Sequence, residues 1–352
     1  MTPRIDQFLP ILIGRDAVGQ HALAVQDLLH DAGVGSTIYA GSAESGWNDH
    51  VRPVAEWHPS GRDVAMYHVA TGSPIADHLA GRAPRLVLDH HNITPPHHFA
   101  LWSPEMVQGA AWGRRQLHDL AGRAELGLGD SSFNAAELKA AGCADSVVAP
   151  ILFDPATLDR GVSDTALRAS GPVWLFVGRL APNKAQHDVV RAFARYRTTY
   201  AADARLRLVG MASPPAYEDA LRRLLADTGL DGAVELTGRV SDEELGAHYR
   251  AADVFVCLSR HEGFCVPILE AFHNELPIVA LRSSAVTETV ADGGVLLDSA
   301  DPDLVAAAAH LLVTDPLARQ VVVERGVRRL ADFAPSRTRA VFLEALAPAL
   351  GA

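Results

Sequence analysis

Strand-length runs of apolar residues alternate with helix-length amphipathic stretches along nearly the whole chain. The strand candidates are rich in Val, Ile and Leu, which is typical of parallel strands covered on both faces. Parallel strands are joined by helical crossovers, so the alternation predicts an α/β protein with doubly wound sheets. We expect strands at Pro10–Gly14, Ser36–Ala40, Val64–Val69, Arg85–Asp89, Leu126–Gly129, Val147–Leu152, Val173–Val177, Arg205–Val209, Ala233–Thr237, Val254–Leu258, Pro277–Ala280 and Val295–Leu297. We expect helices at Ala22–Ala32, Pro104–Ala121, Gln186–Tyr200, Ala216–Asp227, Glu243–Ala251, Val266–Asn274, Val286–Ala291 and Ser336–Leu350.

The alternation falls into two series, each covering about half of the 352 residues, which predicts two domains. The joint is expected in the polar, Pro- and Gly-containing stretch Asp154–Pro172. We therefore expect a first domain at 1–160, a second at 170–333 and a final helix within 334–352. Open α/β sheets bind ligands at the carboxyl ends of their strands, and two facing sheets would form a cleft. The loops after the strands are where functional residues are expected.

Charge and composition limit the partners. The net charge of −11 argues against nucleic-acid binding, which needs a basic face. Three cysteines cannot form a disulfide framework, and no apolar run reaches the roughly 18 residues of a spanning helix. The apolar stretch Phe8 to Ile13 lacks the features of a secretory signal, so we expect a buried strand and a cytoplasmic protein. Arg114, Arg115 and Arg123 could meet an anionic membrane surface or form a solvated helix face.

Two cations follow the first strand of the second half. Arg179 and Lys184 stand five residues apart, with Pro182 between them, just before a predicted helix. Only two of the 31 basic residues are lysine, so a lysine kept at this place is a mild sign that its point charge is wanted. The pair predicts a diphosphate site, and the alternative is two solvated surface cations.

Two carboxylates bracket another strand end. Glu262 and Gly263 precede Pro267, which suits a first helical turn, and Glu270 follows within the helix. The helix N-terminus is an anion site, while the two carboxylates suit sugar hydroxyls. For Glu270 alone, a carboxylate favoured by the helix dipole is the simpler interpretation.

Three further loops carry weaker signals. The loop Gly238–Ser241 could hold a nucleobase on its backbone, or Ser241 or Asp242 could simply cap the next helix. The turn Gly14–Gln20 could cradle a phosphate or be a tight turn, and its sequence is neither GxGxxG nor a P-loop. The stretch Asp89–His98 holds four histidines, but no paired ligand spacing is present, so we expect no metal. His90 or His91 could instead hydrogen-bond a substrate, and His97 and His98 are expected at the surface.

Taken together, the segment Glu262 to Glu270 resembles the E-x7-E signature of retaining glycosyltransferases of family 4, which have the two-domain GT-B fold. The stretch Val177–Lys184 resembles that family's GR-L-x-P-x-K motif. The first half resembles a bacterial branch that acts on polysaccharides and related glycans. Ala185 and Cys265 stand where glycine is common in the family.

The resemblance implies a role for each matching residue. Arg179 and Lys184 would bind the donor diphosphate, Glu262 would contact the transferred sugar, and His91, ahead of His90, would face that sugar. The remaining donor-binding residues would be Gly19 near the diphosphate, Arg239, Val240 and Ser241 around the base, Gly263, Phe264 and Cys265 through backbone N–H groups, and Glu270 on the ribose. The final helix would return to the first domain.

The function implied is transfer of a hexose, with GDP-mannose as a family-level choice of donor, to a hydroxyl of a glycan or glycolipid. No cofactor or metal is expected, because the cations would meet the charge of the departing phosphate. The two alternatives are a nucleotide-sugar epimerase of the same architecture and a non-enzymatic sugar-binding protein. The second of these would need an export signal and aromatic stacking platforms, whereas aromatic residues make up only 6% of the chain.

Overall fold

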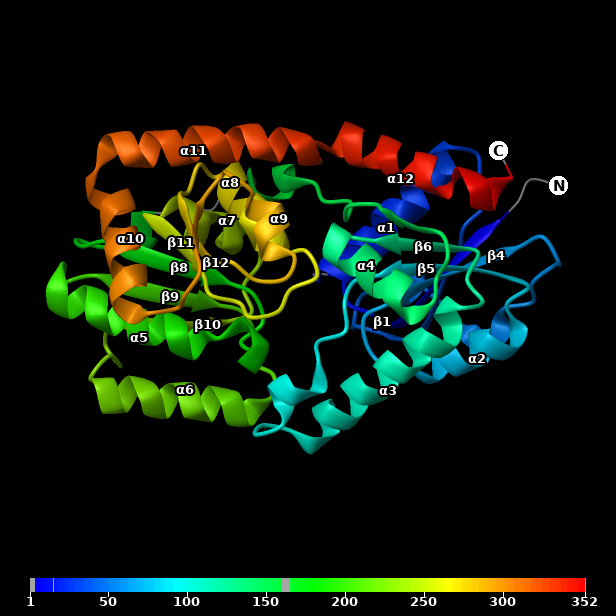
Figure 1. Cartoon of the computed structure of the whole chain (residues 1–352), viewed down its shortest axis with the longest axis horizontal. Helices are drawn as coiled ribbons and strands as arrows, with labels where there is room; N and C mark the ends of the chain where they lie inside the picture. Colours follow the sequence, from blue (N-terminus) through cyan, green and yellow to red (C-terminus); the bar gives the residue numbers. More distant parts are fainter. Residues whose placement is uncertain (1–3, 15, 160–164, 352) are drawn as a thin grey trace. The chain divides into compact units, whose positions relative to one another are not determined.

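The computed structural model describes residues 4–14, 16–159 and 165–351, so Arg15 of the first turn and residues 160–164 of the expected joint lie outside it. The chain forms two compact units. The first takes in the chain up to His97, Glu105–Phe153 and the chain from Phe333 onward; the second takes in His98–Pro104 and Asp154–Asp332. Each unit is a parallel sheet with helices on both faces (Figure 1).

The first unit contains a seven-stranded sheet in the order β3-β2-β1-β4-β5-β6-β7. All six residues of β4 are buried, as expected of a strand covered on both faces. Its strands are β1 (Ile5–Leu12), β2 (Ile38–Ala43), β3 (Arg52–Pro53), β4 (Val64–Val69), β5 (Arg85–His90), β6 (Leu126–Gly129) and β7 (Ser146–Val148). Its helices are α1 (Ala17–Asp31), α2 (Pro74–Arg82), α3 (Pro104–Ala121), α4 (Ser132–Ala141) and α12 (Pro335–Leu350).

The first strand was predicted at Pro10–Gly14; β1 overlaps this range, but it begins five residues earlier, at Ile5. Two polar residues inside β1 hide its apolar character, and both are buried because they find partners. Asp6 accepts hydrogen bonds from the backbone N–H of Thr37, at 3.0 Å, and from the indole of Trp57, at 3.2 Å. Gln7 bonds to His68 across the sheet. Burial of a polar side chain is tolerated where its hydrogen bonds are satisfied.

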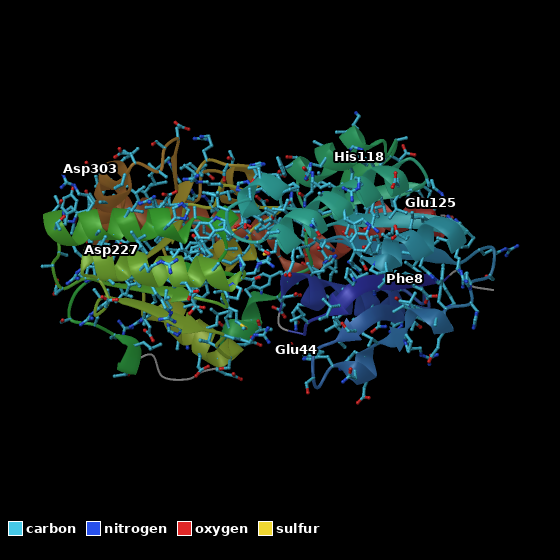
Figure 2. All side chains as sticks on the ribbon, turned by 90° about the horizontal axis from the view of Figure 1, so that it is seen from below. Phe8, Glu44, His118, Glu125, Asp227 and Asp303 are labelled. Atoms are coloured by element: carbon cyan, nitrogen blue, oxygen red, sulfur yellow. The ribbon has the colours of Figure 1, made fainter. Side chains whose placement is uncertain are left out.

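The last helix completes the core of the first unit. Phe342, Leu346 and Ala349 of α12 are buried against residues of α1 and of the sheet, among them Val25 and Val64. Figure 2 shows the contrast between core and surface in this unit, where Phe8 lies inside the ribbon and Glu125 at its edge.

The second unit contains a six-stranded sheet in the order β10-β9-β8-β11-β12-β13. Its strands are β8 (Val173–Val177), β9 (Arg205–Val209), β10 (Val234–Gly238), β11 (Val254–Cys257), β12 (Ile278–Leu281) and β13 (Val295–Leu297). Its helices are α5 (Gln186–Thr199), α6 (Pro215–Thr228), α7 (Asp242–Arg250), α8 (Val266–His273), α9 (Val286–Val290), α10 (Pro302–Thr314) and α11 (Pro316–Leu330). The short segment His98–Pro104 also belongs to this unit. Its Trp102 packs edge-on against Tyr217, with 5.0 Å between the ring centroids.

Candidate functional site

The strand order of the second unit reverses between β8 and β11, which are hydrogen-bonded neighbours. In an open parallel sheet, ligands bind beyond the carboxyl ends of the strands at such a reversal. The loop after β8 carries Arg179 and Lys184, and the loop after β11 carries Glu262. The topology thus brings the two predicted donor loops of this unit together.

The loop after β8 is a short 3₁₀ turn, Pro182–Lys184, followed by Ala185 at φ 53°. Arg179 is exposed, and Lys184 is half-buried. Among the residues that the structure describes, no side chain caps the N-terminus of α5. The loop therefore offers two cations beside a helix start.

The loop after β11 enters α8 in the same way. Cys265 takes φ 78° as the residue before the helix, and within the described chain no side chain caps α8. Pro267 lies in the first turn, as predicted. Successive N–H groups around a left-handed residue form a concave anion site. Ala185 and Cys265, the two departures from the family's glycines, thus both occupy left-handed positions that favour glycine.

Lys184 and Glu262, predicted from separate motifs, form an ion pair with each other. Two hydrogen bonds join the loops that carry them. The side-chain amide of Asn183 donates to the carbonyl of His261 at 3.1 Å, and the N–H of Arg260 donates to the carbonyl of Asn183 at 2.8 Å. The side chain of Glu262 is only 7% exposed. The carboxylate of Glu262 is therefore the partner of the ammonium that is predicted to bind a diphosphate.

Glu270 lies on α8 and is buried, with 8% of its surface exposed. The hydroxyl of Tyr249, on α7, donates to its carboxylate at 2.6 Å. Burial raises the pKa of Glu270 to about 7. Tyr249 was not predicted, because nothing in its spacing marks it, and it positions Glu270.

The loop after β10 contains Gly238, at φ 71°, followed by Arg239, which is exposed, and Val240, which is half-buried. Ser241 caps α7, as one interpretation of the sequence predicted: its hydroxyl accepts from the N–H of Glu244 at 3.2 Å. The carboxylate of Glu244 accepts in return from the N–H of Ser241 at 2.8 Å. Ser241 is thus fixed at the start of α7 through both its hydroxyl and its backbone N–H.

The thiols of Cys257 and Cys265 lie 3.9 Å apart, within hydrogen-bond distance, and do not form a disulfide. Phe264 is buried, and its carbonyl accepts from the hydroxyl of Thr289 at 2.6 Å. Gly263 is buried between Glu262 and Phe264. Burial and the hydrogen bond from Thr289 therefore fix the backbone of the segment Gly263 to Cys265.

In the first unit, Gly19 is required by packing. A Cβ at this position would lie 1.9 Å from the carbonyl oxygen of Ile13. The N–H of Gly19 donates to the carboxylate of Asp16 at 2.6 Å, which caps α1. The tight-turn interpretation of this segment therefore has direct support.

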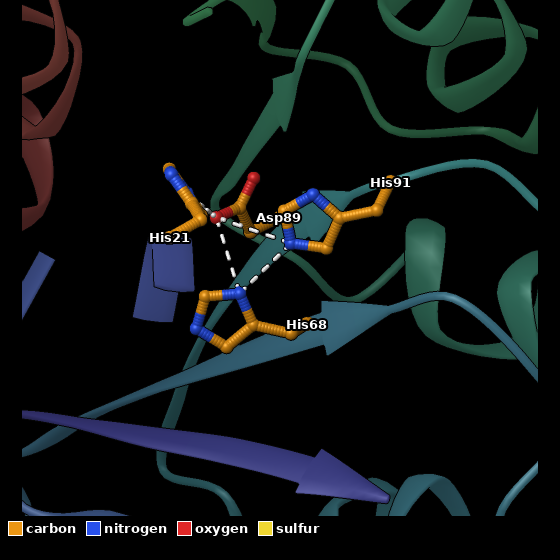
Figure 3. Close-up of side chains that lie close together, drawn as sticks. All are labelled: His21, His68, Asp89 and His91. Atoms are coloured by element: carbon orange, nitrogen blue, oxygen red, sulfur yellow. Dashed lines mark hydrogen bonds and ion pairs between the residues drawn. The ribbon is translucent and has the colours of Figure 1, made fainter. Parts of the chain in front are cut away.

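His90 and His91 point in different directions from the end of β5. His90 faces Glu137 of α4, at 3.2 Å. His91 faces Asp130, at 3.0 Å, and His68, at 2.9 Å (Figure 3). Its side chain is only 2% exposed, and both ring nitrogens are engaged. A direct contact with a donor sugar is therefore restricted to the ring edge or the backbone.

His91 belongs to a buried cluster with His21 on α1, His68 on β4 and Asp89 on β5 (Figure 3). Although burial opposes a charge on His91, Asp130 and Asp89 raise its pKa to about 9. Burial lowers the pKa of His68 to about 4. The sequence analysis missed His21 and His68, because they lie far from His91 in the chain.

Arg114, considered above as a lipid contact, serves the first unit internally. It pairs with Glu137 at 3.1 Å and donates to the carbonyl of Ile93 at 2.8 Å. No helix in the described part of the chain is both long and apolar enough to span a bilayer.

Comparisons with known proteins identify relatives. Residues 163–329 match the family described as Glycosyl transferases group 1. The chain is 32% identical to a D-inositol 3-phosphate glycosyltransferase of Kineococcus radiotolerans over 67% of this chain and 59% of that protein. It is 36% identical to a GDP-mannose-dependent alpha-(1-6)-phosphatidylinositol monomannoside mannosyltransferase of Mycolicibacterium smegmatis over 41% of this chain and 39% of that protein. The chain thus spans less than two thirds of the length of these curated relatives.

The fold has solved counterparts. Anabaena Alr3699/HepE, crystallised with UDP-glucose, aligns over 99% of this chain and all of its own with a TM-score of 0.76 at 19% identity. At this sequence identity, the similarity supports the fold alone. It confirms the predicted class, α/β with two Rossmann-like parallel-sheet domains of GT-B type.

Proposed function

Because the chain belongs to the group 1 glycosyl transferase family, we propose that it transfers a hexose from a nucleoside-diphosphate sugar to a hydroxyl of a glycan or glycolipid. The observation that carries the proposal is that two loops meet at the strand reversal of the second unit: the loop with Arg179 and Lys184, and the loop that leads into the uncapped start of α8. The ion pair of Lys184 and Glu262 joins these loops. Cations and oriented N–H groups are what a diphosphate needs.

The chemistry follows from where charge develops. When the sugar leaves, negative charge grows on the diphosphate, and the guanidinium of Arg179 and the ammonium of Lys184 stabilise it. The diphosphate competes with Glu262 for Lys184, and the freed carboxylate then accepts from a hydroxyl of the sugar. The backbone of Gly263 to Cys265 contacts phosphate and sugar.

The nucleoside is held by neighbouring elements. Glu270 accepts from the ribose, while Arg239, Val240 and Ser241 frame the base, mainly through the backbone. Gly19 and His91 belong to the first unit, whose role is the acceptor and the sugar. These assignments rest on the sequence motifs.

Retention of configuration is proposed to proceed by same-face substitution. A covalent intermediate would need a carboxylate at the anomeric carbon. Glu262 is instead assigned to a hydroxyl farther round the ring. The bond between the anomeric carbon and the diphosphate oxygen breaks, and the acceptor's hydroxyl oxygen bonds to that carbon on the same face. The proton of the acceptor hydroxyl passes to the leaving phosphate oxygen. The protein cations meet the phosphate charge, so this step needs no divalent ion at the diphosphate.

GDP-mannose is the proposed donor, supported by the mannosyltransferase among the relatives. Epimerisation is not favoured, because the matched relatives are transferases.

The test is a thermal-shift screen with GDP, UDP and dTDP. A ligand that binds only the folded state raises the melting temperature by mass action. We expect one nucleotide to shift it and the double variant Arg179→Ala/Lys184→Ala to abolish that shift. The matched control is Lys139→Ala/Arg223→Ala, which removes the same charges from exposed positions. An unchanged shift in the first double variant would overturn the site.

A further inference from the structure

Three atoms of the buried cluster in the first unit form a triangle of the right size for a metal ion. Nδ1 of His68 lies 2.9 Å from Nε2 of His91, and Oδ2 of Asp89 lies 3.3 Å and 3.6 Å from those two nitrogens. Points with these separations lie on a circle of radius about 1.9 Å. An ion about 2.0–2.1 Å from each atom, the distance of zinc to imidazole and carboxylate ligands, would sit just above that plane. We propose that His68, Asp89 and His91 bind a divalent transition metal, with zinc the best match.

The outer hydrogen bonds leave the correct nitrogen of each ring for the metal. Nε2 of His68 donates to the amide oxygen of Gln7 at 2.8 Å, so Nδ1 keeps its lone pair. Nδ1 of His91 donates to Asp130 at 3.0 Å, so Nε2 is the free nitrogen once that ring is neutral. Metal-binding histidines almost always donate their second N–H to a carboxylate or carbonyl in this way.

His21 is a supporting residue rather than a ligand. The backbone N–H of Leu152 donates to its Nδ1 at 2.8 Å, which fixes the proton of a neutral ring on Nε2. That N–H donates to Oδ2 of Asp89 at 2.9 Å and orients the carboxylate. The protein therefore offers two imidazoles and one carboxylate, with a further coordination position open.

A second observation points to a missing cation. The other carboxylate oxygen of Asp89, Oδ1, is buried and has no hydrogen-bond partner among the described residues. A buried, unpaired carboxylate oxygen costs free energy. Oδ1 could complete a bidentate contact with the ion. Two fully buried carboxylates, Asp89 and Asp130, would then be balanced by the two charges of the metal.

The position of the three ligands in the fold indicates a structural role for the ion. The three ligands come from the end of β4, the end of β5 and the residue just beyond it, next to the β1–β4 strand reversal of this unit. The ion would fix the loop that carries His91 and Asn92. The metal site does not require the proposed transferase activity, although it shares His91 with the sugar-facing role proposed above. It also differs from metal binding at the diphosphate, which that activity does not require.

The experiment uses the full chain, stripped with a chelator and titrated with zinc(II) or cobalt(II). We expect one equivalent of metal by elemental analysis, visible absorption typical of low-coordinate cobalt, and a higher melting temperature with zinc than with chelator. His68→Gln and His91→Gln should each lose the cobalt spectrum. His90→Gln is the control, since that neighbouring ring faces Glu137 instead.

His21→Gln separates the supporting role from a ligand role. It should keep the stoichiometry of one and weaken zinc affinity about 10- to 100-fold, as loss of an outer partner does. Loss of the site in this variant would overturn the assignment of His21. A wild-type protein that binds no metal, or whose melting temperature is the same with zinc and with chelator, would overturn the site, even if a ligand variant fails to fold. The cluster would then be a hydrogen-bonded network around a protonated His91.

Discussion

At the scale of single residues, the ion pair of Lys184 and Glu262 gives the first prediction. Glu262→Gln keeps the size of the side chain and removes a negative charge that competes with the diphosphate. The affinity for the bound nucleoside diphosphate should therefore rise about 3- to 10-fold, since each tenfold step is about 1.4 kcal/mol. Turnover of the nucleotide sugar should fall, because a sugar hydroxyl loses its hydrogen bond to a charged carboxylate.

Calorimetric titration measures the affinity, and Glu243→Gln, an exposed carboxylate on α7, is the matched control. Weaker nucleotide binding by Glu262→Gln would mean that the carboxylate helps to hold Lys184 in place rather than blocking it.

Glu270 predicts a pH dependence of stability. Burial raises its pKa to about 7, from an ordinary value of 4.5. Between these values the folded chain holds a proton that the unfolded chain has lost. The resulting stability is fully present below pH 4.5 and is lost as the pH rises through 7. The wild type should therefore lose stability relative to Glu270→Gln between about pH 4.5 and 7, by at most about 1.4 kcal/mol per pH unit, and level off above this range. The free energy of unfolding of both proteins is measured by chemical denaturation at each pH. If it changed equally with pH in the two proteins, the pKa of Glu270 would not be raised.

Residue types in short motifs were predictable, whereas their partners were not. The rare lysine and the E-x7-E pattern marked Lys184 and Glu262, but no spacing showed that they pair. His21 and His68 carry no local signal, because only the stacking of parallel strands brings them beside Asp89. Absence of a ligand spacing along the chain therefore did not exclude a grouping of metal ligands in space.

At the scale of elements, the two loops proposed to bind the donor share a backbone feature, a left-handed residue just before a helix. Ala185 and Cys265 hold left-handed conformations, which cost a non-glycine residue roughly 1–2 kcal/mol. The family's preference for glycine at these positions has this physical cause. The strands of the second half were predicted to within one residue at each end, whereas the buried Asp6 and Gln7 displaced the prediction of β1.

Helix α12 gives a prediction about stability. Leu346 is fully buried in the core of the first unit, while Leu317, on α11, is 74% exposed. Leu346→Ala should lower the free energy of unfolding by about 2–5 kcal/mol, through lost burial and a cavity. The same substitution at Leu317 should change it by less than about 0.5 kcal/mol. Equal effects in chemical denaturation would show that α12 contributes nothing to that core.

At the scale of the whole molecule, the chain crosses between the two units at two places besides the joint. The return at Phe333 was expected from the predicted final helix, whereas the crossing at His98–Pro104 was not. The segment His98–Pro104 joins the second unit through Trp102, and the chain from Phe333 joins the first. Two series of strands predicted two domains, but such long-range packing has no local pattern. Each unit nevertheless has its own apolar core, which makes separate responses to ligands measurable.

Hydrogen exchange on the intact chain tests this separation. A nucleoside diphosphate at about 100 times its Kd stabilises the state that binds it by about 2.7 kcal/mol, so exchange through unfolding of that unit should slow about 100-fold. We expect slowing in β8, β11 and α8 of the second unit, and its loss in Arg179→Ala/Lys184→Ala. Removal of zinc should instead speed exchange in β4 and β5 of the first unit, with the second unchanged. If either ligand protected both units equally, the chain would unfold as one cooperative body, and the two cores would not be independent.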